Sequence, residues 1–525
     1  MPRRLKHWGW GYEDEQPSAE EAKGAAGAIS AHLGFGSRDP REPVALEQVE
    51  LPTPRLDPPA SIASYCSTEV YDRALHSYGR AYRDIVRAFR GQFDHPPDVV
   101  AHPRDEREVA EVLEWAGSAG AAVVPFGGGT SVVGGVELRE AGAYAGGVTI
   151  DLKALDRVLE VDEVSRAARI QAGATGPVLE AQLREHGLTL RHYPQSFEFS
   201  TLGGWIATRA GGHYATLMTH VDDMVESMRA LTPRGEWESR RLPGSGAGPS
   251  PDRMLIGSEG TLGIVTEAWV RVQERPTQRA TATARFESFA AGAEAVRALS
   301  QSGLHPANCR LIDPDEAALT GAGDGKHALL VLGFESADHS VDAALDRALT
   351  LCRDHGGEGE RRDSRSGAAG SWREAFLRAP YIRDTFIAMG VISDTFETAV
   401  TWDKFPRFHD EVKEAVTQAV RDICGEGKVS CRFTHVYPDG PAAYFTVLAP
   451  GRAGAEIEQW DQIKAVAGDA VIAGGGTITH HHAVGRDHRP WYDRQRPEPF
   501  AQALRGAKAA VDPSGILNPG VLTDP

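Results

Sequence analysis

The stretch "PFGGGTSVVGG", residues 125–135, is the part of this sequence that decides its fold. It ends the apolar run "AAVVPF", which predicts a strand, and it carries five glycines in nine residues. It lacks the G-x-G-x-x-G dinucleotide fingerprint, because Val132 occupies the position of the last glycine. It also lacks the Lys-Ser or Lys-Thr of a nucleotide phosphate loop. Missing side chains still let N–H groups converge on phosphate oxygens, so the stretch is either an anion-binding loop or a tight structural turn.

Two further loops of small residues favour the binding interpretation. "STLGGWIATRAGG" covers residues 200–212, and "IGSEGTLGIVTEA" covers residues 256–268. Both loops lead into apolar runs, and the loop at 127–135 follows an apolar run. Three such loops in a single α/β unit predict one elongated ligand that main-chain groups hold at several places.

Length and charge exclude several classes of protein. The chain has 525 residues and a formal net charge of −17. Its length predicts two or three domains, and its acidity argues against nucleic acid as a partner, because phosphate binding needs concentrated Lys and Arg. We find no run of 18 apolar residues and no secretory pattern at the N-terminus. Five scattered cysteines do not suggest a disulfide framework, so we expect a cytoplasmic protein.

The periodicity of apolar residues predicts an α+β protein. Residues 1–95 are irregular and end in a helix, "YRDIVRAFRGQF"; residues 96–276 alternate strands with helices such as "DEREVAEVLEWAGSAG". Residues 277–490 form a second α/β unit, in which long helices and the hairpin "VSCRFTHVY"–"AAYFTVLAP" predict a sheet covered by helices on one face. Residues 491–525 form a C-terminal segment. The glycine-rich stretches 243–251 and 355–371 predict mobile loops.

Three consecutive histidines, His480, His481 and His482, follow the glycines of "GGGTITHHHAVG". They suggest a metal site, an acid/base station, or a loop held by hydrogen bonds. Histidine exchanges protons near neutral pH, and adjacent cationic rings repel one another, so at least one ring should be neutral. In a strand-like run, alternate side chains face opposite ways, which would separate His481 from the other two.

Segments along nearly the whole chain carry a family resemblance. They include "HWGWGYED", "FEFSTLGGWIATRAGG", "IGSEGTLGIVTEA", "YIRD", "FETAVTWD", "THHHAVG" and "DPSGILNPG". With them the chain resembles the alkyldihydroxyacetonephosphate synthases, flavoenzymes of ether-lipid synthesis in the vanillyl-alcohol oxidase and p-cresol methylhydroxylase superfamily. The resemblance implies a two-subdomain FAD-binding domain over 96–276, an α/β cap domain with a helix-covered antiparallel sheet over 277–490, and a C-terminal segment that returns to the FAD domain.

The same resemblance implies non-covalent FAD and assigns the residues that hold it. His192 precedes the "FEFSTLGG" loop and is the residue to suspect of a covalent flavin link, which we do not expect. The cofactor-binding residues implied are Pro125, Gly127, Gly128, Gly129, Thr130, Ser131, Gly134, Ser200, Thr201, Gly203, Gly204, Glu259, Gly260, Gly263 and Ile264.

The histidine run separates two branches of the superfamily. Flavin-linked 2-hydroxy-acid dehydrogenases commonly read Glu-His-Gly there, and a partner segment H-x-G-D-G-N-x-x-H supplies a metal. In this chain the partner segment is "THVYPDGPAAYF", which keeps His435 but has Tyr444 near the second histidine. Two lost ligand types argue against a metal, although His435 leaves that question open. The acid/base interpretation gains, because Tyr444, His480, His481 and His482 match synthase positions assigned to proton transfer.

Two arginines match further synthase positions. Arg383 of "YIRD" matches the arginine that grips the substrate phosphate, since a guanidinium suits phosphate bidentately. Its alternative is a salt bridge with Asp384. Arg310 of "CRLID" would stabilise negative charge near the flavin. Its alternative is a strand residue that faces solvent.

The resemblance therefore implies an enzyme that exchanges the acyl chain of acyl-dihydroxyacetone phosphate for a fatty alcohol, with no net redox change at the flavin. A FAD-dependent dehydrogenase or oxidase of a 2-hydroxy acid or alcohol is the alternative, since one fold hosts many chemistries. A non-enzymatic flavin or lipid carrier is the third class. We expect a small-molecule lipid substrate, peripheral membrane contact and a homodimer.

Overall fold

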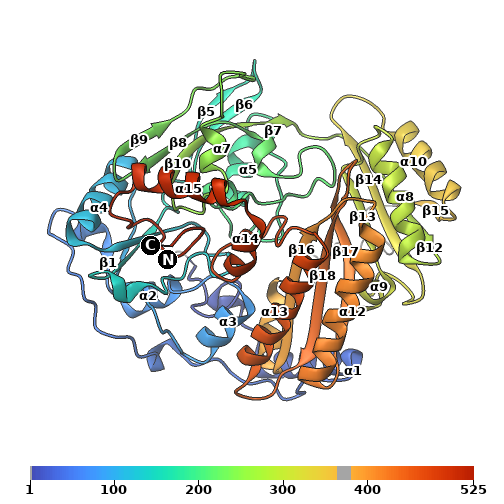
Figure 1. Ribbon diagram of the computed structural model, residues 1–525, viewed down its shortest axis with the longest axis horizontal. Coiled ribbons are helices and arrows are strands. Elements are labelled where there is room, and N and C mark those ends of the chain that lie inside the picture. The colour runs from blue at the N-terminus through green and yellow to red at the C-terminus, as the bar shows by residue number, and fades with distance from the viewer. Residues whose placement is uncertain (1–2, 363–379, 525) are drawn as a thin grey trace.

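The computed structural model describes residues 3–362 and 380–524 (Figure 1). It is an α+β structure with three main sheets, as the sequence predicts. Two smaller sheets build the half of the molecule that contains the glycine loops, and a seven-stranded sheet builds the other half.

The first sheet places the loop 127–135 directly after a buried strand. Its strand order is β1-β2-β4-β3, and β2, β4 and β3 are parallel. The strands are β1 (Cys66–Ser67), β2 (Val99–Ala101), β3 (Ala122–Phe126) and β4 (Gly147–Asp151). Helix α4 (Glu106–Ala119) connects β2 to β3, and the Asp105 side chain caps it by accepting the Glu108 N–H at 2.9 Å. A reciprocal capping box does not form, because the Glu108 carboxylate binds Arg104.

The second sheet is antiparallel with the order β5-β6-β10-β8-β9. Its strands are β5 (Val158–Asp162), β6 (Ala167–Gln171), β8 (Val225–Thr232), β9 (Gly235–Glu238) and β10 (Ile264–Arg271). The minor pair β7 (Leu188–Thr189) and β11 (Gln273–Glu274), with the helices α5 (Gly176–Arg184), α6 (Leu202–Thr208) and α7 (Asp252–Leu255), completes this part. Leu179, Leu183 and Trp205 of α5 and α6 pack into its core. The predicted loop 243–251 has no helix or strand.

The N-terminal residues contain more helix than their composition predicts. Beside α2 (Val70–Leu75) and the expected α3 (Tyr82–Phe89), helix α1 covers Ala19–Leu33. Ser18 and Glu21 form a capping box at its start, and Gly34 ends it in the left-handed region with φ of 90°. The prediction of an irregular segment was wrong for α1, because its stripe of buried residues is narrow.

The seven-stranded sheet is antiparallel throughout, in the order β15-β12-β14-β13-β17-β18-β16. Its strands are β12 (Gln278–Phe286), β13 (Asn308–Ile312), β14 (Ala328–Ser336), β15 (Glu358–Arg362), β16 (Val391–Ala399), β17 (Lys428–Val436) and β18 (Pro441–Pro450). Helices α8 (Phe289–Gln301), α10 (Asp342–Asp354), α12 (Phe405–Cys424) and α13 (Glu456–Ala473) cover one face, and the short α9 (Pro314–Leu319) follows β13 (Figure 1). The predicted covering of one face by helices is confirmed.

Because side chains alternate along the strands, one face of this sheet packs in the core and the other lies free of the covering helices. In β17 the side chains of Cys431 and Phe433 enter the core under the helices, as Ala443 and Phe445 do in β18. The intervening residues face the opposite way, toward the glycine loops, because successive side chains of a strand point to opposite faces. That free face becomes one wall of the site.

Residues 358–362 and the C-terminal segment both contain regular secondary structure. Residues 358–362 form the edge strand β15, so the predicted mobile loop at 355–371 was wrong there, and residues 363–371 lie outside the described part of the chain. The C-terminal helices are α14 (Arg489–Gln495) and α15 (Glu498–Val511). The chain beyond them adds to the first sheet, since the Val123 N–H donates to the Ile516 carbonyl at 2.8 Å. Among the described residues, no helix combines the length and apolarity needed to cross a membrane.

Candidate active site

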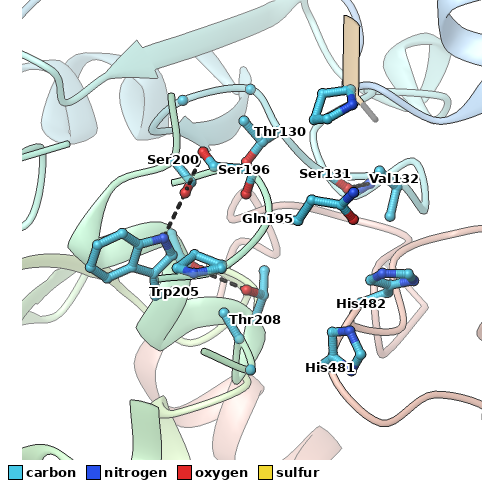
Figure 2. A pocket seen from close by; sticks show the side chains of 18 of the residues that line it. Thr130, Ser131, Val132, Gln195, Ser196, Ser200, Trp205, Thr208, His481 and His482 are labelled. Atoms are coloured by element: carbon cyan, nitrogen blue, oxygen red, sulfur yellow. Dashed lines mark hydrogen bonds between the residues drawn. The ribbon is translucent and has the colours of Figure 1, made fainter. Parts of the chain in front are cut away.

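A cavity of about 410 Å³ lies between the glycine loops and the free face of the seven-stranded sheet (Figure 2). Side chains and backbone from both halves of the molecule line it. The predicted site residues that line it are Pro125, Gly127, Gly128, Gly129, Thr130, Ser131, Ser200, Thr201, Gly203, Gly204, Glu259, Gly260, Gly263, Ile264, Arg310, Arg383, Tyr444, His481 and His482. Gly134 and His480 are the two predicted residues outside the lining.

The glycines of the first loop are required by close backbone packing. A Cβ on Gly127 would lie 2.2 Å from Thr201 Oγ1, and one on Gly128 would lie 2.0 Å from the Phe199 carbonyl oxygen. Gly129 has φ of +65°, a conformation that favours glycine. The loop thus brings bare main chain against residues 199–201, and both segments line the cavity. Gly134 serves the turn instead, with φ of +67°, and a Cβ there would meet Arg139.

The second and third loops are tied to their neighbours by side chains. Thr201 caps α6 by accepting the Gly204 N–H, and the Trp205 indole donates to Ser200 Oγ at 2.7 Å (Figure 2). Glu259 accepts the N–H groups of Val484 and Gly485, both at 2.9 Å. Burial raises the pKa of Glu259 to about 7. Glu259 therefore joins the third loop to the segment that follows the three histidines.

Two arginines and a tyrosine stand on the free face of the sheet. Arg310 is buried and lines the cavity, so its alternative as a solvent-facing residue is excluded. Burial, and then the charge of Arg432, lower the pKa of Arg310 to about 9. The guanidinium carbon of Arg432 lies 3.8 Å from the centre of the Tyr444 ring. Arg432 also forms a buried ion pair with Glu316, so it holds a fixed cation against the phenol ring.

A bulge in β17 turns His435 toward the cavity. Phe433 lies in the core, so strict alternation would put His435 there too; the pairing with β18 shifts register between these residues. As a result both Thr434 and His435 line the cavity. The His435 Nε2 lies 3.1 Å from the Gly212 carbonyl oxygen, to which it donates. Sequence patterning gave no sign of this bulge.

A single buried carboxylate organises the three histidines. Glu397 on β16 has no exposed surface and accepts the N–H groups of His481 at 3.1 Å and His482 at 2.8 Å. It also accepts from the His480 N–H and from the Thr479 hydroxyl. Burial alone would raise the pKa of Glu397, but the three histidines and the Thr479 hydroxyl outweigh it and hold the pKa well below its usual value. Glu397 thus fixes the turn as an anion.

The histidine run is a turn and not a strand, so the predicted alternation was wrong. His481 and His482 both line the cavity (Figure 2). Their ring centres lie 6.1 and 5.5 Å from the centre of the Tyr444 ring. Burial lowers the pKa of His481 to about 3 and that of His482 to about 4. Both rings are therefore neutral near pH 7. His480 faces away from the cavity, where its Nε2 lies 2.7 Å from the Tyr437 hydroxyl.

One nitrogen from each of His435, His480 and His481 lies within 4.8 Å of the other two. The spacing is close enough to share a cation, although His480 and His481 also contact each other directly through Nδ1 atoms 3.0 Å apart. The expectation that this protein uses no metal stays a prediction.

Arg383 reaches the cavity from a helix over residues 380–388. Its predicted alternative, a salt bridge to Asp384, does not form. The Asp384 carboxylate instead lies 3.4 Å from Lys6 Nζ and accepts the Trp10 N–H at 3.0 Å. The only hydrogen bond that the described residues give Arg383 goes to the Arg80 carbonyl at 3.3 Å. Its guanidinium therefore remains available to an anionic ligand.

Besides Arg432, sequence reasoning missed three residues of the site. Trp10 and Asn518 line the cavity, and Glu397 holds the histidines from behind it. Asn518 donates to the carbonyls of Gly135 and Glu259, so it joins the first and third loops. The segments "HWGWGYED", "FETAVTWD" and "DPSGILNPG" contain these residues, but a role for each one required the contacts.

His192 lies behind the cavity wall rather than in its lining. It is 1% exposed, its ring centre is 5.0 Å from that of Trp205, and neither ring nitrogen has a hydrogen-bond partner. Burial lowers its pKa from 6.5 to about 3. The absence of a covalent flavin link stays a prediction.

The depressed pKa of His192 predicts a specific acid sensitivity. Its contribution to stability is full above pH 6.5 and is lost as the pH falls toward the folded value, because only the unfolded state then binds the proton. Between pH 7 and pH 5 the unfolding free energy of the wild-type protein should fall by about 2 kcal/mol more than that of His192→Leu. Urea unfolding of both proteins at pH 7 and pH 5 measures this difference. His32→Gln, at an exposed position of α1, is the control, and an equal pH response in both variants would contradict the prediction.

Comparison with known proteins gives the family. Residues 97–239 match the model of the FAD binding domain, and residues 275–522 match that of the C-terminal domain of FAD linked oxidases. An alkyldihydroxyacetonephosphate synthase from Trypanosoma brucei brucei is 30% identical over 476 residues, which cover 86% of this chain and 78% of that protein. The chain belongs to the alkyldihydroxyacetonephosphate synthase family. A solved structure of such a synthase has a TM-score of 0.82 and 26% identity, with 98% of each chain covered.

The fold of this synthase-family chain extends to the wider superfamily. A structure of p-cresol methylhydroxylase with substrate bound has a TM-score of 0.70 at 14% identity, covering 97% of this chain and 98% of that one, and shows the shared fold alone. FAD is the cofactor, as both matched models indicate. The cavity fits it, because its glycine loop approaches the space with main chain where a Cβ would collide with Phe199 or Thr201.

Proposed function

We propose that this protein catalyses the exchange of the acyl chain of acyl-dihydroxyacetone phosphate for a long-chain alcohol, forming an ether-lipid precursor. One observation carries the proposal: two arginines, a tyrosine and two neutral histidines converge on a single cavity at the end of the glycine-loop cradle. A phosphate-bearing substrate needs a cation, and an exchange of oxygen substituents needs proton acceptors and donors. The family supports the same reaction.

The residues divide this work by their chemistry. Arg383 holds the substrate phosphate, and Arg310 stabilises negative charge beside the flavin. His481 and His482 accept protons as neutral imidazoles, and Tyr444, under the fixed cation of Arg432, donates and recovers a proton. The bound flavin supplies the reactive ring on which the exchange depends. His480 has no part in contacting substrate.

Further lining residues support a lipid substrate. Leu319, Phe386 and Leu448 also line the cavity and belong to one hydrophobic cluster, which gives a long chain apolar surface to contact. Peripheral membrane contact belongs to this proposal, since the lipid would enter from a bilayer. A homodimer belongs to it as well, as the family resemblance implies. Light scattering of the purified protein and co-sedimentation with vesicles test these two points.

The decisive experiment supplies a long-chain acyl ester of dihydroxyacetone phosphate and a fatty alcohol without any electron acceptor. Mass spectrometry should detect the ether product and the released fatty acid. Anaerobic bleaching of the flavin by D-2-hydroxy acids at turnover rates, with no ether product, would instead establish the oxidoreductase. Absence of both reactions would favour a carrier.

Arg383→Ala should lower kcat/KM for the phosphate-bearing substrate about 100-fold, because a charge-assisted hydrogen-bond pair is lost. Arg383→Lys should recover part of this loss. Arg407→Ala, which removes an exposed arginine of α12, is the control and should stay within about twofold of wild type. Equal activity of Arg383→Ala and Arg407→Ala would remove Arg383 from substrate binding.

A further inference from the structure

Behind the cavity, a continuous row of polar groups leads from His481 toward the protein surface. His481 Nδ1 lies 3.0 Å from His480 Nδ1, and His480 Nε2 lies 2.7 Å from the Tyr437 hydroxyl. The Tyr437 hydroxyl lies 2.8 Å from Thr219 Oγ1 and 3.5 Å from His220 Nδ1. Each group in the row can both give and take a proton, since an imidazole has two nitrogens and a hydroxyl is donor and acceptor at once.

We propose that His481, His480, Tyr437 and His220 form a proton relay that connects the active-site cavity with solvent. Tyr437, His480 and His220 act through His481 and do not contact the substrate. The inference deepens the proposed function and rests on it. It also gives a role to His480, the predicted catalytic residue that the fold turns away from the cavity.

The fixed hydrogen bonds set the direction of the relay. His220 Nε2 lies 2.8 Å from the His480 carbonyl oxygen, and a carbonyl only accepts, so Nε2 carries the hydrogen. The neutral His220 ring therefore keeps a lone pair on Nδ1 for the Tyr437 or Thr219 hydroxyl. If His480 donates from Nε2 to Tyr437, its Nδ1 accepts from His481 Nδ1–H. The remaining nitrogen of His481, Nε2, is then the proton acceptor at the cavity.

The row runs through half-buried groups and ends near an exposed segment. His480, His481 and His220 are each half-buried, and burial is the main cause that lowers the pKa values of His480 and His481. Leu217, three residues before His220, is 62% exposed. The charged groups that face the row are Glu397 and Arg310 near His481, and Arg209, Asp223 and Asp439 near Tyr437. The relay thus spans the wall between cavity and surface.

The proposed reaction requires such an exit. The ester carbon–oxygen bond breaks, the ether carbon–oxygen bond forms, and the alcohol loses its hydroxyl proton. Near neutral pH the fatty acid leaves as a carboxylate, so one proton per turnover must reach solvent, with no change in oxidation state overall. His481 Nε2 takes this proton, and one proton then moves along each link: from His481 Nδ1 to His480 Nδ1, from His480 Nε2 to the Tyr437 oxygen, and from the Tyr437 hydroxyl to His220 Nδ1. The His220 cation that results releases one proton to solvent and returns to its neutral form.

Tyr437→Phe tests the relay because it removes one oxygen and keeps the ring. We expect kcat to fall about tenfold or more with KM little changed, and the rate to rise with the concentration of buffer base. In mixtures of light and heavy water, the wild-type rate should depend on more than one exchanging proton, and this dependence should weaken in the variant. Tyr144→Phe removes a hydroxyl that donates to the Gly515 carbonyl far from the row and is the matched control. FAD content and melting temperature verify that both variants fold.

Unchanged kcat in Tyr437→Phe, or equal losses in the two variants, would overturn the relay. A wild-type protein that makes no ether product would overturn the proposed function instead, and a measurement without turnover still decides the relay. Nitrogen-15 NMR of histidine-labelled protein should show hydrogen on Nδ1 of His481 and on Nε2 of His480. Bare Nδ1 atoms on both rings would contradict the relay.

Discussion

Gly128→Ala is expected to yield a folded protein that binds no FAD. The added Cβ would lie 2.0 Å from the Phe199 carbonyl oxygen and 2.9 Å from the Ser200 Cα, and both are backbone atoms that cannot rotate away. The loop 125–131 would have to separate from residues 199–201, which moves its N–H groups out of register with the cofactor phosphates. We expect flavin absorbance near 450 nm to fall to about a tenth of the wild-type value per polypeptide.

Gly27→Ala is the matched control for this loss. Its Cβ would meet nothing within 4 Å, and its place in α1 favours alanine. The control should bind FAD as wild type does. Full loading of Gly128→Ala after purification in excess FAD would show that the first loop does not hold the cofactor, and the assignment of Gly127 to Ser131 would fall with it.

Glu397→Gln is expected to remove nearly all activity while FAD stays bound. The carboxylate accepts from three consecutive backbone N–H groups and from a threonine hydroxyl, and an amide group of the same shape would turn a donor toward some of them. The turn that carries His481 and His482 should loosen. We expect kcat to fall about 100-fold or more and the unfolding free energy to fall by about 3 kcal/mol.

The measurements for this variant are turnover, flavin absorbance and urea unfolding. FAD loading should persist, because the glycine loops make no use of Glu397. Glu414→Gln, at an exposed position of α12, is the control and should match wild type. Activity within about tenfold of wild type would show that the histidines hold their places without this anion.

The relation between sequence and structure differs from one part of the site to another. The strand that ends in "AAVVPF" and the glycines after it are a local pattern, and the structure places them as expected. The roles of Arg383 and Asp384 could not be separated by sequence alone, because both side chains are charged and adjacent. In the structure Asp384 contacts Lys6 and Trp10, so it is not the partner of Arg383. Lys6 and Trp10 are far from Asp384 along the chain.

The histidine run shows the same limit. Its composition left a metal site, an acid/base station and a hydrogen-bonded loop open, and its geometry depends on Glu397 of β16 and on Glu259 of the FAD-binding half. These contacts make a turn where alternation predicts a strand, and they direct His481 and His482 to the cavity and His480 away from it. The bulge that turns His435 inward depends likewise on its pairing with β18.

The sequence by itself determined the α+β class, the main strands and helices, and the three glycine loops, because these follow from short-range periodicity and from residues whose conformational freedom is intrinsic. That these loops hold FAD was implied by the family resemblance. Only the tertiary structure decided which titratable groups meet. Their partners are tens to hundreds of residues apart, and burial in a shared cavity, which no local pattern encodes, sets both their direction and their charge.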